Sequence, residues 1–160
     1  MALRPEFRRP PGLALLAAIS LLVSGASPAH ADKCDDLAAQ LKSQIDGLGV
    51  GKTAANVIYL SHPLATEITL GCASRNFTNQ LFARADSRKP VPAFLNLVAT
   101  AAAIIFTLPK DDMLKGATRC IDRMGLLRGD DVSSRFRRLE MRCIRTATEA
   151  SITIERDTDE

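Results

Sequence analysis

The chain has 160 residues, a formal net charge of +3 at pH 7, four cysteines and no tryptophan. This length predicts one domain, and hydrophobic and charged shares of 46% and 24% exclude both wholesale disorder and a polytopic membrane protein. So small a positive charge does not by itself indicate nucleic-acid binding.

Residues 1–31 predict a cleavable secretory signal peptide. Three arginines precede an uncharged apolar run over residues 12–23, and small residues follow it up to Ala31. The run is shorter than the roughly twenty residues that a permanent membrane span requires. Cleavage after Ala31 leaves a mature chain of residues 32–160 with a formal charge of +1, located in the periplasm or secreted. An uncleaved N-terminal anchor is the alternative.

The mature chain begins with a predicted amphipathic helix over residues 32–46. Acidic residues near its start suit the helix dipole, and Gly47 ends it. Gly49 and Gly51 then predict a flexible turn.

Strands are expected next. The runs 57–60 and 65–72 are rich in β-branched residues or alternate in polarity, which predicts a hairpin. A third strand is expected over residues 80–85, although a helix fits this run nearly as well. A Ser-Arg-Lys-Pro sequence over residues 87–90 then breaks the chain.

Residues 92–108 form the most hydrophobic part of the mature chain, and their alanines favour helix. We expect a buried core helix here. A membrane segment over residues 93–108 is the alternative, although a helix of that length spans only about 24 Å. Pro109 ends this helix, and a second helix is predicted over residues 111–124.

Two segments near the C-terminus alternate with a period of two residues, which predicts a closing hairpin over residues 136–145 and 150–155. The order of elements predicts an α+β fold for residues 32–160. We expect a single small domain in which antiparallel β-hairpins pack with about three helices.

The four cysteines, Cys34, Cys72, Cys120 and Cys143, all lie in the mature chain. Their spacing is too wide for the close ligand pairs of zinc and redox motifs. An even number of cysteines in an exported chain predicts two structural disulfides. Three connectivities are possible, and the shorter loops slightly favour Cys34–Cys72 with Cys120–Cys143.

Two features resemble catalytic motifs. The Gly-Lys-Thr sequence that ends at Thr53 matches the end of a phosphate-binding P-loop, but Asp46 stands where that motif needs its first glycine. His62 is the single histidine of the mature chain, and a turn residue is the expected role. No catalytic residue, metal site or cofactor is therefore expected.

Six arginines fall between residues 128 and 145. Such a cluster predicts a candidate surface for an anionic envelope component or a partner's acidic face, formed by Arg135, Arg138, Arg142 and Arg145. Arg138 and Arg142 are expected to share the solvent face of one strand with Glu140. The alternative is an ordinary solvated sheet face.

The basic leader and the four well-separated cysteines resemble those of small exported proteins of alphaproteobacteria that have no assigned activity. This resemblance implies a periplasmic location and no particular mechanism. We expect a non-enzymatic binding or interaction module without a nucleic-acid partner, and without membrane association after signal cleavage. A small hydrolase that uses His62 with an unidentified serine or carboxylate is the alternative.

Overall fold

The computed structural model describes residues 29–75, 78–125 and 127–156, and it shows an α+β fold with one antiparallel sheet. The described helices are α1 (Ala29–Gln44), α2 (Pro92–Phe106) and α3 (Lys110–Arg123). The described strands are β1 (Gly49–Ala54), β2 (Val57–His62), β3 (Ala65–Gly71), β4 (Gln80–Ala85), β5 (Asp131–Phe136), β6 (Leu139–Arg145) and β7 (Ala150–Arg156). The expected fold class is confirmed.

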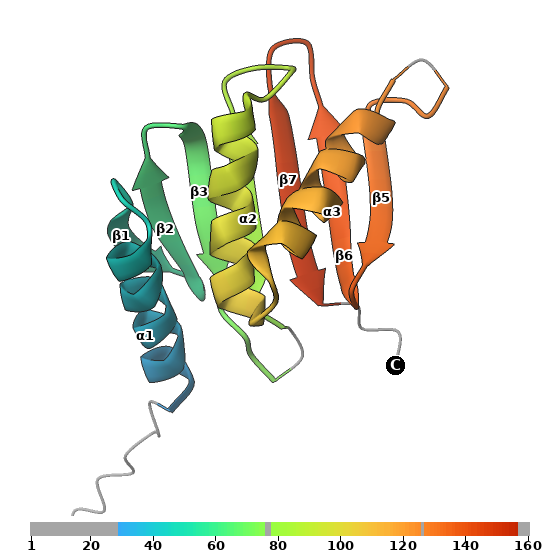
Figure 1. Cartoon of the computed structure of the whole chain (residues 1–160). Helices are drawn as coiled ribbons and strands as arrows, with labels where there is room; N and C mark the ends of the chain where they lie inside the picture. The colour runs from blue at the N-terminus through green and yellow to red at the C-terminus, as the bar shows by residue number, and fades with distance from the viewer. Residues whose placement is uncertain (1–28, 76–77, 126, 157–160) are drawn as a thin grey trace, which may run out of the picture.

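The seven strands follow the order β1-β2-β3-β4-β7-β6-β5, and every neighbouring pair is antiparallel. The last strand, β7, therefore joins the two halves of the chain, because it lies between β4 and β6. All three helices lie on one face of the sheet (Figure 1). The opposite face is not covered by any helix of the described chain.

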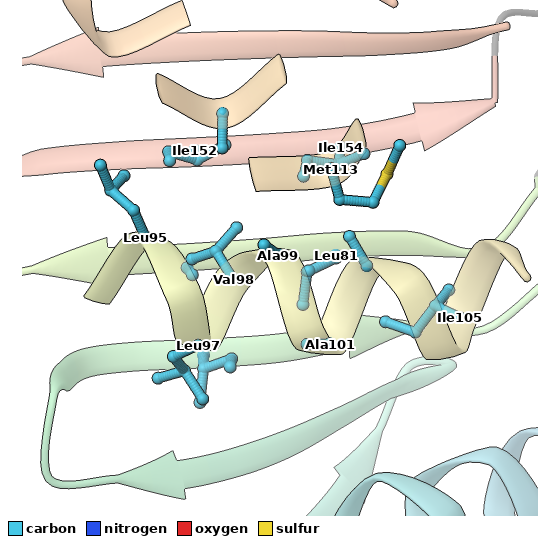
Figure 2. Packing of buried hydrophobic residues seen from close by; sticks show 14 of the residues in the cluster. Leu81, Leu95, Leu97, Val98, Ala99, Ala101, Ile105, Met113, Ile152 and Ile154 are labelled. Atoms are coloured by element: carbon cyan, nitrogen blue, oxygen red, sulfur yellow. The ribbon is translucent and has the colours of Figure 1, made fainter. Parts of the chain in front are cut away.

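The core lies between the helices and the covered face of the sheet. Most side chains of α2 are buried, and Val98 and Ala99 are fully so. Figure 2 shows α2 side chains gathered in one cluster with Leu81 of β4 and Ile152 of β7. Burying one such aliphatic side chain contributes about 1.5–3 kcal/mol. The prediction of a core helix at residues 92–108 is confirmed, and no helix of the described residues is long and apolar enough to cross a membrane.

Two disulfides join helices to the sheet, in the pairing that the loop lengths slightly favoured. Cys34 of α1 is bonded to Cys72 at the end of β3, and Cys120 of α3 is bonded to Cys143 of β6. Cys120 and Cys143 are fully buried. These bonds fix the outer helices α1 and α3 to opposite halves of the sheet.

Close packing between α3 and β6 explains a glycine inside a helix. A Cβ atom added to Gly116 would lie 2.8 Å from the terminal methyl group and the sulfur of Met141 and 3.1 Å from the ring of Phe136. Glycine is unfavourable inside a helix by about 1 kcal/mol. At this position it allows α3 to approach the sheet.

The prediction for Gly49 and Gly51 was wrong, because both residues lie in β1 rather than in a turn. Gly47, with a φ of 79°, does make the turn after α1. At residues 80–85 the strand is confirmed and the helical alternative is not.

The structure also corrects the predicted strand over residues 136–145. Phe136 ends β5, and Leu139 begins β6 opposite it. Arg137 and Arg138 form the two-residue turn between them, with φ values of 53° and 61°. The predicted signal peptide lies almost wholly outside the described residues, which begin at Ala29, the first residue of α1.

Candidate interaction surface

The four arginines of the candidate surface do not lie together. Arg135 and Arg142 project from the uncovered face, on β5 and β6. Arg138 lies in the turn between these strands. Arg145 lies on the helix side, where its guanidinium donates hydrogen bonds to the Ile121 and Met124 carbonyls at the end of α3, at 3.3 and 3.4 Å. Arg145 therefore helps to cap α3.

Arg142 is engaged by an acidic neighbour. Its Nε and Nη2 atoms donate hydrogen bonds of 2.9 and 2.6 Å to the two carboxylate oxygens of Asp131. These bonds lower the pKa of Asp131 and raise the pKa of Arg142. An external anion would have to compete with Asp131 for this arginine.

Other arginines on the uncovered face also lie next to carboxylates. Arg84 forms ion pairs of 3.3 and 3.9 Å with Glu67 and Glu149. Arg135 lies opposite Glu140 in the β5–β6 register. The uncovered face is therefore a mixed surface of paired charges rather than a basic one.

His62 connects two turns through both of its ring nitrogens. Nε2 lies 3.1 Å from the Asp46 carbonyl oxygen, and the Leu64 N–H donates to Nδ1 at 3.1 Å. The acceptor role of Nδ1 leaves Nε2 to carry the proton. A hollow of about 410 Å³ lies beside His62, but among the described residues this ring has no hydrogen bond to a serine or carboxylate side chain. These contacts fit the expected turn role.

A different basic surface lies along α3. A groove of about 540 Å³ runs along the outer flank of this helix and reaches Phe136 at the end of β5. Its lining residues are Leu114, Lys115, Thr118, Arg119, Asp122, Arg123 and Phe136. We call this feature the α3 groove.

Three cations follow one another along the α3 groove at intervals of four residues. Lys115, Arg119 and Arg123 are all exposed, and within the described chain none of them forms an ion pair with a carboxylate. The Arg119 guanidinium lies 6.0 Å from the centre of the Phe136 ring. Leu114 and Phe136 are half-buried and pack against the core, so the groove has an apolar floor.

The sequence analysis missed this row of cations, although a signal was present. The buried residues of α3 include Met113, Ala117 and Cys120, which define its inner face. With 3.6 residues per turn, positions 115, 119 and 123 must share the outer flank.

Among the described residues, no group of three or more His, Cys, Asp or Glu side chains is placed to hold a metal ion. The two disulfides are typical of a protein from an oxidising, extracytoplasmic compartment. Comparison with known proteins found no matching family model, curated protein or solved structure.

Proposed function

We propose that this protein is an exported, disulfide-stabilised binding module that holds an acidic segment of a partner protein in the α3 groove. The observation that carries this proposal is the row formed by Lys115, Arg119 and Arg123 beside the apolar floor of Leu114 and Phe136. Cations at the edge of an apolar groove are suited to a chain that presents both carboxylates and apolar side chains.

The state of these cations in the free protein favours the α3 groove over the arginine-rich strands. A carboxylate can approach Arg119 without breaking an ion pair of the described chain. On the uncovered face, binding to Arg142 would require the loss of two hydrogen bonds to Asp131. The free energy gained when an external carboxylate binds Arg142 would be largely cancelled by the loss of the Asp131 ion pair and by desolvation of the charged groups.

The shape of the groove favours a peptide segment over a lipid surface. A surface that binds a membrane presents apolar side chains that protrude into the lipid. Leu114 and Phe136 are instead half-buried and pack against the core, whereas Lys115 and Arg119 are exposed. An extended peptide can present apolar side chains to Leu114 and Phe136 and carboxylates to the neighbouring cations.

The proposal also includes export of the protein, with removal of the signal peptide. Cleavage after Ala31 would remove the first three of the 16 residues of α1 and leave Cys34 in place for its bond to Cys72. The expected N-terminus of the mature protein is Asp32, which N-terminal sequencing of the periplasmic fraction would test. A chain that retains Met1 would contradict this part of the proposal.

Fluorescence anisotropy with a labelled synthetic peptide tests the binding function. The peptide Thr-Glu-Thr-Leu-Thr-Glu-Thr places two glutamates and one leucine on the same side of an extended chain. We expect saturable binding that weakens as salt rises. The variant Lys115→Glu/Arg119→Glu should weaken binding by about tenfold or more.

The matched control makes the same charge change away from the groove. Lys42 on α1 and Lys52 on β1 are exposed, and Lys42→Glu/Lys52→Glu should keep wild-type affinity. Equal losses in both variants would contradict a localised site. Binding of phosphatidylglycerol vesicles without binding of the peptide would replace the protein partner by a lipid surface and overturn the proposal.

A further inference from the structure

We propose that the Cys34–Cys72 disulfide is a site of thiol–disulfide exchange, where the thiolate of a partner dithiol attacks the Cys72 sulfur and releases Cys34 of α1. This site is separate from the α3 groove. Figure 1 shows α1 and α3 over opposite halves of the sheet, and each of these helices has its own disulfide to the sheet. Exchange at Cys34–Cys72 therefore does not depend on peptide binding in the groove.

The two disulfides differ in their access to solvent. Cys120 and Cys143 are both fully buried, so a thiol can reach their bond only when α3 separates from β6. Cys34 is 5% exposed, and Cys72 is half-buried. Exposed disulfides are the ones that exchange in folded proteins, because the attacking thiolate must reach a sulfur atom. Cys34–Cys72 is therefore the exchangeable bond of the two, and Cys72 is its accessible end.

Cys72 also lies where a partner chain can approach. It lines two adjoining hollows of about 540 and 280 Å³, and Cys34 lines the smaller one. Thr53, Asn56 and Ser74 also line the smaller hollow. Their hydroxyl and amide groups can form hydrogen bonds with the backbone of a chain that brings its thiol to Cys72.

The charges around the smaller hollow do not oppose a thiolate. Asp35 and Arg75 both line it, one of each sign. A neighbouring guanidinium stabilises a thiolate, and a neighbouring carboxylate has the opposite effect. With one of each, access to the sulfur decides the reactivity of this bond.

The reaction transfers two electrons from the partner to this disulfide. The partner thiolate bonds to the Cys72 sulfur, the Cys34–Cys72 bond breaks, and Cys34 leaves as a thiolate that takes up a proton. The second thiol of the partner loses its proton and attacks the partner's own sulfur, which releases Cys72 as a thiolate that is protonated in turn. The partner dithiol is thereby oxidised to a disulfide, and Cys34 and Cys72 become thiols.

The two cysteines are anchored differently once the bond is broken. The Cys72 N–H donates to the Asn56 carbonyl oxygen at 2.8 Å, which holds Cys72 to the β1–β2 turn. Cys34 lies in the first half of α1, whereas the fully buried residues Ala38 and Leu41 lie in the second half. Reduction should therefore loosen the beginning of α1 and leave the rest of the helix packed.

Timed reduction tests which bond exchanges. The oxidised protein is treated with dithiothreitol without denaturant, and samples are quenched with N-ethylmaleimide and mapped by mass spectrometry. Cys34 and Cys72 should be labelled about tenfold or more faster than Cys120 and Cys143, because the buried pair requires a larger opening of the structure. Equal rates, or faster labelling of Cys120 and Cys143, would overturn the proposal.

Glutathione tests which sulfur is attacked. As a monothiol it forms a mixed disulfide, which the same quench preserves at early times. We expect about tenfold or more glutathione on Cys72 than on Cys34, because Cys72 is the more exposed of the two. Glutathione mainly on Cys34, equally on both cysteines or on neither would overturn attack at Cys72.

Amide hydrogen exchange tests the release of α1. The N–H groups of residues 36–39 bond to the carbonyl groups of the preceding turn. In the variant Cys34→Ser/Cys72→Ser these amides should exchange about tenfold or more faster than in the wild type, while those of α2 keep their rates. The same measurement on wild-type protein that has been reduced and alkylated at this pair covers the case in which the variant does not fold. Unchanged exchange at residues 36–39 would overturn the release of α1.

Discussion

The turn between β5 and β6 carries a backbone conformation that its residues do not favour. Arg137 and Arg138 both have positive φ, the arrangement of a type I′ turn, in which Asn-Gly is the preferred pair. An L-residue other than glycine loses about 1–2 kcal/mol in this region. The double substitution Arg137→Asn/Arg138→Gly should therefore stabilise the protein.

The size of this effect follows from three contributions. Relief of the two left-handed residues is worth up to about 2–4 kcal/mol, and asparagine realises only part of it. Glycine at position 138 lowers the stability by about 0.5–1 kcal/mol, because it gives the unfolded chain greater conformational freedom. Loss of the 3.4 Å ion pair between Arg137 and Asp112 costs at most about 1 kcal/mol, because the Arg137 side chain is 62% exposed. The net gain is about 1 kcal/mol, or about 4 °C in Tm.

Thermal unfolding followed by circular dichroism measures this gain, and the chain has its own control. The β1–β2 turn is also a two-residue turn, with Ala55 and Asn56 at φ values of 50° and 62°. The variant Ala55→Asn/Asn56→Gly should raise Tm by a similar amount. If only this control is stabilised, Arg137 and Arg138 make contacts that outweigh the backbone cost, and the reasoning fails.

Three further predictions concern the disulfides, His62 and the surface ion pair. Cys120→Ala/Cys143→Ala should destabilise the protein by about 3 kcal/mol in urea unfolding, since the bond closes a loop with a sequence separation of 23; a loss below 1 kcal/mol would mean that packing alone holds α3. His62→Ala should lower stability by about 1 kcal/mol through loss of its two backbone contacts, and an unchanged urea midpoint would contradict this role. The Asp131 carboxyl, observed by NMR, should titrate below the usual aspartate range and return to it in Arg142→Gln, because the lowered pKa comes first from the Arg142 hydrogen bond. That contribution to stability is present above the unfolded pKa and is lost as pH falls through the folded pKa.

The elements that were predicted correctly have strong local signals. The alanine-rich run of α2 between prolines and the alternating runs of β2 and β3 are set by short-range preferences. Strand β5 was missed because its turn lacks glycine and asparagine. Arg138 extends the alternation of β6 by one residue, and the break at Arg137 was not recognised as a turn.

The candidate surface was harder to predict because it depends on contacts between distant segments. Arg142 was expected to face solvent, and it does so, but Asp131 engages it from a strand that was not predicted. Arg145 was assigned to the same surface, yet the alternation along β6 turns it toward the end of α3. No periodic pattern in one segment could show which carboxylate or carbonyl would meet each guanidinium.

The sequence by itself determined the α+β class, most of the helices and strands, and the presence of four cysteines suited to structural disulfides, because each of these follows from local preference or from composition. Only the tertiary structure decided that β7 lies between β4 and β6, that α3 is held against β6 by Cys120–Cys143, and that the three described helices all cover the same face of the sheet. The α3 groove exists because that packing places the outer flank of a helix beside Phe136 of an edge strand. Such a site is made by residues that are distant along the chain, and burial of the core brings them together.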